Sequence, residues 1–118
     1  MPQNKKEVYH MTVGAFAKQE QLHIAVAGDL KREITGGYCG DLLSWVMSRA
    51  TCGDAWFTVM GNVNAIAVAV LADCACIILC ESAALDEEAR QKAEQQGVTV
   101  LTARSNAFDL AAHLAKSL

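Results

Sequence analysis

Short apolar runs rich in strand-forming residues recur along the chain, with helical patterns between them. They occupy residues 22–27, 55–60, 74–80 and 98–101. Each run is short, as buried strands are, and the segments between them are long enough for a helical crossover. Strands that alternate with helices pair side by side in parallel through right-handed crossovers. The sequence therefore predicts an α/β three-layer sandwich with a mostly parallel central sheet, covered by helices on both faces.

Capping residues and apolar spacing predict the helices. They are expected at about 13–19, 41–50, 63–72, 86–96 and 106–118. Thr12, Asn62 and Ser105 are the expected caps of three of them, because their side-chain oxygens can accept a hydrogen bond from the first turn. The segment that follows Asn62 also alternates as a strand would, but its length and alanine content favour a helix that is apolar nearly all round. Residues 1–10 are polar and are expected to form a flexible tail, which leaves 11–118 as a single domain.

Composition limits the partners that we expect. The net charge is −3 with a pI near 5.5, and basic residues adjoin one another only at 5–6 and 31–32. Nucleic acids and anionic membrane surfaces are not expected partners, because both require clustered positive charge. The apolar run 65–72 is much shorter than the roughly 20 residues of a membrane span. Residues 1–10 lack the apolar centre of a signal peptide. We therefore expect a cytoplasmic protein.

The chain has five cysteines, and three of them crowd into one predicted strand. Cys74, Cys76 and Cys80 have the same parity, so a strand would place them on one face. Cys39 or Cys52 could complete a set of four metal ligands. However, no CxxC spacing occurs, and a central strand hides its side chains. We expect reduced, structural thiols and no metal site. An iron–sulfur or redox-linked role is the weakest alternative.

A cluster of glycines at Gly36, Gly37 and Gly40 directly precedes a helical pattern. Three close glycines are typical of a tight turn, and a glycine loop that opens a helix presents backbone N–H groups to an anion. In open parallel sheets, ligands bind beyond the carboxyl ends of the strands. The loops expected there are 28–29, 61–64, 81–82 and 102–105.

Polar side chains and flexible backbone in these segments define a candidate ligand site. The predicted ligand-binding residues are Thr35, Gly36, Gly37, Asn62, Asn64 and Arg104. Asparagine and threonine can hydrogen-bond a polar ligand, and arginine can supply a counter-charge. The histidines lie far apart in sequence, so no catalytic group is expected.

Trp45 lies among polar residues on its predicted helix. A tryptophan with polar neighbours often marks a contact surface. Ile66 and Val70 lie on the nearly all-apolar helix, which a domain this small can hardly bury on every side. These three residues are the predicted interface of a homodimer.

The run Ile-Thr-Gly-Gly-Tyr-Cys-Gly-Asp-Leu-Leu-Ser at 34–44 resembles the signature of the DRTGG domain family. The likeness continues through 53–58, 64–69 and 86–88 and covers roughly residue 11 to the end. The Thr-Gly-Gly core is kept, but Glu33 and Ile34 replace the Asp-Arg pair before it. A contact made by that arginine is therefore absent here, unless Arg32 substitutes for it.

The resemblance implies the same layered fold and a non-catalytic regulatory role. DRTGG domains occur beside CBS domains in some pyrophosphatases that adenine nucleotides regulate, and stand-alone members occur near iron-only hydrogenase genes. We therefore expect a homodimeric module that binds a small ligand such as an adenine nucleotide; no cofactor is assigned. An accessory factor that binds a protein of an iron-only hydrogenase system is the alternative. Stand-alone members are often labelled HPr serine kinases, but the chain has no Gly-Lys pair, which a P-loop requires.

Overall fold

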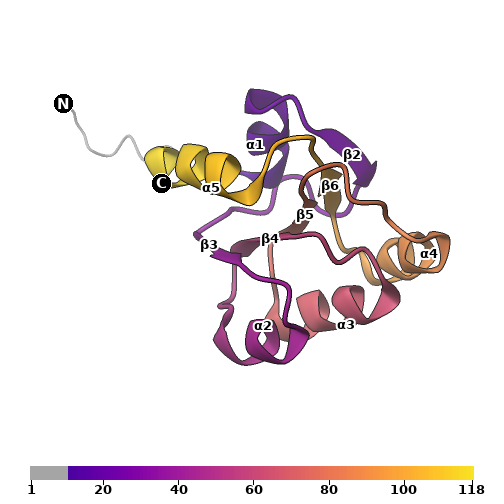
Figure 1. Ribbon diagram of the computed structural model, residues 1–118. Helices are drawn as coiled ribbons and strands as arrows, with labels where there is room; N and C mark the ends of the chain where they lie inside the picture. Colours follow the sequence, from indigo (N-terminus) through magenta and orange to yellow (C-terminus); the bar gives the residue numbers. More distant parts are fainter. Residues whose placement is uncertain (1–10) are drawn as a thin grey trace.

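The computed structural model describes residues 11–118, which include a five-stranded sheet. Its strands are β2 (His23–Val26), β3 (Gly36–Cys39), β4 (Asp54–Thr58), β5 (Cys76–Leu79) and β6 (Val100–Thr102). Their order across the sheet is β2-β6-β5-β4-β3; β3, β4, β5 and β6 run parallel, whereas β2 is antiparallel to β6 (Figure 1). Residues 1–10, for which we predict a flexible tail, lie outside the described residues.

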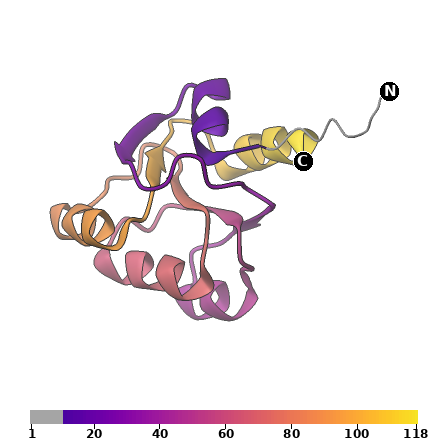
Figure 2. The same ribbon diagram turned by 180° about the vertical axis from the view of Figure 1, so that it is seen from behind.

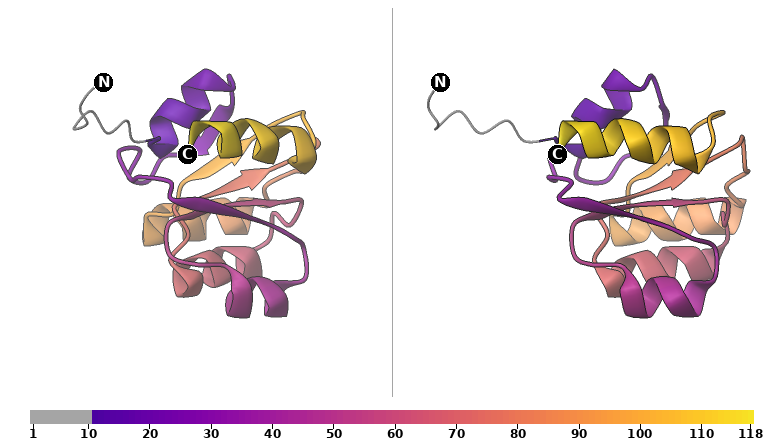
Figure 3. Two further views of the ribbon diagram at one scale, coloured as in Figure 1. Left: turned by 90° about the vertical axis from the view of Figure 1, so that its left-hand side faces the viewer. Right: turned by 60° about the vertical axis from the view of Figure 1, so that its left-hand side comes forward.

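Helices cover both faces of this sheet. They are α1 (Val13–Gln19), α2 (Leu43–Arg49), α3 (Val63–Ala72), α4 (Glu87–Gln96) and α5 (Ala107–Ser117). The helices α2, α3 and α4 lie on one face, and α1 and α5 lie on the other (Figures 2 and 3). The predicted three-layer sandwich with a mostly parallel sheet is confirmed. No helix within residues 11–118 combines the length and the apolarity needed to cross a bilayer.

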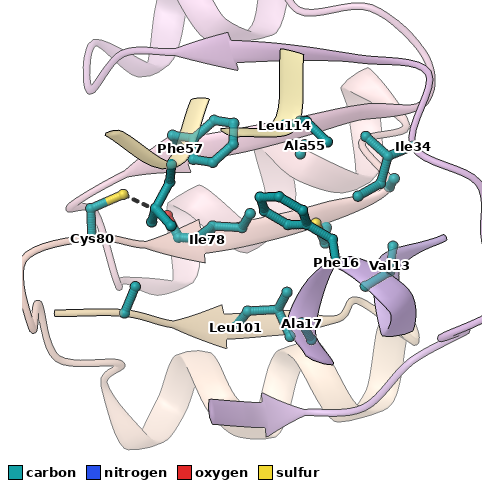
Figure 4. Packing of buried hydrophobic residues seen from close by; sticks show 14 residues of the cluster. Val13, Phe16, Ala17, Ile34, Ala55, Phe57, Ile78, Cys80, Leu101 and Leu114 are labelled. Carbon is teal, nitrogen blue, oxygen red and sulfur yellow. Dashed lines mark hydrogen bonds between the residues drawn. The ribbon is translucent and has the colours of Figure 1, made fainter. Parts of the chain in front are cut away.

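Two apolar cores lie between the layers. The core under α1 and α5 includes Val13, Phe16, Phe57, Ile78, Leu101 and Leu114 (Figure 4). The core under α2, α3 and α4 includes Val46, Trp56, Ile66, Ile77, Leu79 and Val100. Every residue of β4 and β5 is buried, because central strands of a parallel sheet are covered on both sides. Trp56 and Phe57 therefore point into different cores, as neighbouring strand residues must.

Most helix boundaries follow from local capping. The side chain of Thr12 accepts a hydrogen bond from Ala15 N, and that of Asn62 accepts one from Ala65 N, so both predicted caps are confirmed. The last helix is instead capped by Asn106, which accepts from the backbone N–H of Asp109. The predicted Ser105 cap is wrong by one residue.

Two local predictions fail for reasons of tertiary structure. The helix predicted from residue 41 begins at Leu43, because the side chain of Asp41 accepts hydrogen bonds from Thr58 Oγ1 at 2.7 Å and from Val59 N at 3.0 Å. The strand β2 is antiparallel to its neighbour. Its carboxyl end and the 28–29 loop therefore lie at the edge of the sheet opposite to the carboxyl ends of the parallel strands.

Candidate functional site

A cleft of about 570 Å³ opens beyond the carboxyl ends of β5 and β6. Its walls are three chain segments, 20–23 between α1 and β2, 82–85 after β5, and 102–105 at the end of β6. The first segment reaches this edge because β2 is antiparallel and begins where the parallel strands end. We call this cavity the first cleft. Its position agrees with the general rule for ligand sites in open α/β sheets.

The backbone of the first cleft adopts unusual conformations. Glu81 and Ser82 are consecutive left-handed residues, with φ of 57° and 58°, and Gln21 on the facing segment has φ of 57°. Such a conformation costs a non-glycine residue about 1–3 kcal/mol and persists only where surrounding contacts impose it. Here, Glu81 N donates to Ser105 O at 2.9 Å and Ser82 N donates to Ala103 O at 2.8 Å. These hydrogen bonds fix two walls of the cleft against each other.

Arg104 gives the first cleft its uncompensated charge. The exposed guanidinium makes no hydrogen bond or ion pair with any residue between 11 and 118. Glu20, on the facing segment, is already engaged, since its Oε1 lies 2.7 Å from His113 Nδ1 on α5. Burial works to raise the pKa of Glu20, but hydrogen bonds from Gln19 and His113 and the charge of His113 outweigh it and lower the pKa. The arrangement favours an anionic ligand.

A second cleft of about 280 Å³ lies beyond the carboxyl ends of β3 and β4. It is lined by residues 39–41, 57–59 and 80–81 and by Ala107 at the start of α5. These lining residues include the carboxylates of Asp41 and Glu81 but no lysine or arginine. Glu81 lines the second cleft and Ser82 the first, so the two cavities adjoin.

The Thr-Gly-Gly run lies at the other edge of the sheet. Gly36 and Gly37 belong to the strand β3 and have no positive φ, so the predicted glycine turn is wrong. Thr35 N donates to Gly53 O at 3.0 Å, and Thr35 Oγ1 donates to Cys52 O at 3.3 Å. The run therefore attaches the beginning of β3 to the segment that enters β4, which gives it a structural role.

Arg32 is held by Asp73 at the end of α3. Its Nη1 donates to Asp73 Oδ1 and its Nη2 donates to Asp73 O, each at 3.0 Å. The hydrogen bond with Asp73 raises the pKa of Arg32. Asp73 is the left-handed C-cap of α3, with φ of 56°. Arg32 thus holds the end of that helix, away from both clefts.

Of the six predicted ligand residues, only Arg104 lines the first cleft. Asn62 and Asn64 follow β4 on the same edge but line neither cleft. Asn62 Oδ1 is occupied by Ala65 N at 2.9 Å. The predicted loops 81–82 and 102–105 do meet. Sequence reasoning missed the segment 20–23, because nothing in a four-residue strand indicates its direction.

The three predicted interface residues do not share one surface. Trp45 is 50% exposed and Val70 is 43% exposed, whereas Ile66 is 1% exposed and packs in the core under α3. Ile66 is therefore unavailable to a partner. The guanidinium of Arg49 lies 3.7 Å from the centroid of the Trp45 ring.

The cysteines are not arranged as expected either. Cys76 and Cys80 are buried in the core under α1 and α5, but Cys74 precedes β5 and packs against the other core. Burial raises the pKa of Cys74 and Cys76 to about 12 and that of Cys80 to about 11. Burial also raises the pKa of Cys39. None of these four thiols is poised to form a thiolate.

Cys52 is exposed, and its thiol lies 3.0 Å from Asp73 Oδ2. This hydrogen bond to a carboxylate raises the pKa of Cys52. Between residues 11 and 118, no three His, Cys, Asp or Glu side chains gather as a metal site requires.

Comparison with known protein families identifies the family that most of this chain matches. The family model described as DRTGG domain matches residues 39–117, more than half of the chain. The match begins after the Thr-Gly-Gly run, so it rests on the remainder of the domain. A search of curated proteins gives no match.

The fold is similar to a solved crystal structure of the CBS and DRTGG domains of the regulatory region of Clostridium perfringens pyrophosphatase, complexed with the activator diadenosine tetraphosphate. The TM-score is 0.68 at 12% sequence identity, over 87% of this chain. The matched region is 45% of that protein's chain, so this chain spans less than half of its length.

Proposed function

The chain belongs to the DRTGG domain family, and from this premise we propose that it is a non-catalytic regulatory module that binds a small ligand such as an adenine nucleotide. The first cleft is the observation that carries the proposal. Its volume of about 570 Å³ is in the range typical of small-molecule sites. Arg104 supplies a cation at its wall that is unpaired among residues 11–118, and the left-handed Glu81–Ser82 turn lies at its edge.

The same cleft supports binding better than catalysis. The hydroxyls of Ser82 and Ser105 donate to no histidine or carboxylate within residues 11–118, so neither has the partner that activates a nucleophile. No cysteine lines the first cleft. The solved relative contains a nucleotide activator, which favours a nucleotide as the ligand class.

Thermal unfolding with a nucleotide panel tests this function. Adenosine, AMP, ADP, ATP and diadenosine tetraphosphate are each added at increasing concentration, with sodium chloride at matched ionic strength as the control. A ligand that binds the folded state raises its stability by RT ln(1 + [L]/Kd) and so raises Tm. We expect at least one nucleotide to raise Tm in a saturable manner. If none does so at millimolar concentration, the proposal is wrong.

We also propose that the module self-associates through the outer surface of α2 and α3. This surface exposes Trp45 and Met47 on α2 and Val70 and Leu71 on α3, and Leu71 is 70% exposed. Large apolar side chains exposed on neighbouring helices favour a protein contact. A component of an iron-only hydrogenase system is the alternative occupant.

Light scattering after size-exclusion chromatography distinguishes a homodimer from a complex with a hydrogenase component. A homodimer has twice the 12.6 kDa mass of the chain. Val70→Asp should convert the dimer to a monomer. The control is Ala112→Asp, because Ala112 is exposed on α5, on the opposite face of the sheet, and this variant should stay dimeric. A monomeric wild type that captures a purified hydrogenase component through Trp45 would favour the alternative.

A further inference from the structure

The two clefts at the carboxyl edge are adjacent but differ in charge. The residues that line them are consecutive in the chain at Glu81–Ser82 and are one residue apart at Ser105–Ala107. Since consecutive Cα atoms are about 3.8 Å apart, the walls of the two clefts lie side by side along both segments. The first cleft has Arg104 as its free charge, whereas the second has only carboxylates.

The first cleft matches a phosphate group. Arginine is the side chain best suited to phosphate oxygens, because its planar fork donates two parallel hydrogen bonds. Hydroxyl groups of Ser82, Thr102 and Ser105 line the same cavity and can add neutral donors. Glu20 also lines this cavity, but its carboxylate is hydrogen-bonded to His113 and makes no ion pair with Arg104.

The second cleft matches a ring that carries hydrogen-bond donors. Phe57, Val59 and Ala107 give it an apolar lining. Asp41 uses Oδ1 for Thr58 and Val59, and its Oδ2 makes no hydrogen bond within the described residues. The carboxylate of Glu81 makes none there either. Ionised carboxylates only accept hydrogen bonds, so they attract amino and hydroxyl groups and repel phosphate.

We propose that the two clefts are halves of one site, which binds a ring-bearing phosphate ester in a fixed direction. The phosphate lies against Arg104 in the first cleft. The ring system lies in the second cleft, where its N–H or O–H groups donate to Asp41 and Glu81. This inference rests on the proposed function. It adds the orientation of the ligand and the residues that bind its phosphate and its ring.

Calorimetric titration of adenosine and AMP tests the orientation, because these probes differ only by the phosphate. The variants are Arg104→Gln and Glu81→Gln, with Arg49→Gln on α2 as the charge-matched control. Losing one charge-assisted contact should weaken binding about 10-fold or more. Arg104→Gln should weaken AMP to this extent and leave adenosine unchanged. Glu81→Gln should weaken both probes by a similar factor, and Arg49→Gln should change neither.

Folding does not obscure this test. Arg104 is exposed and has no partner within the described residues, so its replacement leaves the fold intact. Arg104→Lys keeps the charge and should recover part of the AMP affinity. AMP binding that Arg104→Gln weakens no more than Arg49→Gln does would overturn the orientation and leave the proposed function standing. Failure of both probes to bind the wild type would overturn the orientation, and the nucleotide panel then decides the proposed function separately.

Discussion

Gly36 on β3 lies directly against the carboxylate of Asp54 on β4, so that a Cβ added at Gly36 would stand 2.7 Å from Asp54 Oδ1. Asp54 cannot easily move away. It is 5% exposed, and its carboxylate accepts hydrogen bonds from Thr51 N at 2.8 Å and Thr51 Oγ1 at 3.0 Å. The glycine of the Thr-Gly-Gly run is thus required by the close approach of two strands.

Gly36→Ala should therefore destabilise the protein by about 1–3 kcal/mol, the usual cost of adding a methyl group to a closely packed site. Gly37→Ala is the matched control, because its Cβ would meet Phe57 Cε2 at an ordinary 3.4 Å. Urea unfolding measures both. Equal losses for the two variants would contradict this explanation of the motif.

Trp56→Phe should cost about 1–3 kcal/mol, because it removes a buried hydrogen bond as well as volume. Trp56 is fully buried, and its Nε1 donates to Gly40 O at 2.8 Å. Trp45→Phe makes the same chemical change at a half-exposed site and should cost at most about 1 kcal/mol. Urea unfolding of each single variant compares them. A larger loss at Trp45 than at Trp56 would contradict a stabilising role for the buried hydrogen bond from Trp56 to Gly40.

The acid stability of the protein should depend on Asp73. Hydrogen bonds from Cys52 and then Arg32 lower its pKa below the ordinary value of 3.8. The unfolded chain therefore takes up this proton at a higher pH than the folded protein does. The stability that Asp73 contributes is complete above pH 3.8 and is lost as the pH falls through the folded pKa.

Urea unfolding at about pH 7 and about pH 3 checks this prediction. Asp73→Asn should lose less stability than the wild type over this interval. The lowered pKa of Glu20 is present in both proteins, so the difference between them isolates Asp73. Identical losses in the two proteins would show that the pKa of Asp73 is not lowered.

Thiol labelling should follow burial. Cys39 and Cys52 are exposed and should react first with iodoacetamide in the folded protein. Cys76 is buried in the core, and its pKa is raised to about 12, so it should react only after unfolding. Peptide mass spectrometry reports each site, and labelling in denaturant should modify all five cysteines. Rapid native labelling of Cys76 would show that the core opens.

Much of the secondary structure was predictable because its causes are local. The caps at Thr12 and Asn62 and the left-handed Gly97 at the end of α4 act within a few residues. The site was only partly predictable. Arg104 and the loops 81–82 and 102–105 follow parallel strands and were found, whereas segment 20–23 required the direction of β2.

The sequence by itself determined that short strands alternate with helices, and hence the layered α/β class. Periodicity encodes burial, and burial is nearly the same for a given strand whichever way it runs. Only the tertiary structure decided the direction of β2, the edge at which Thr35 lies and the pairing of Arg32 with Asp73. These choices depend on contacts between residues far apart in the chain, and no local pattern records which distant partner gives the lowest free energy.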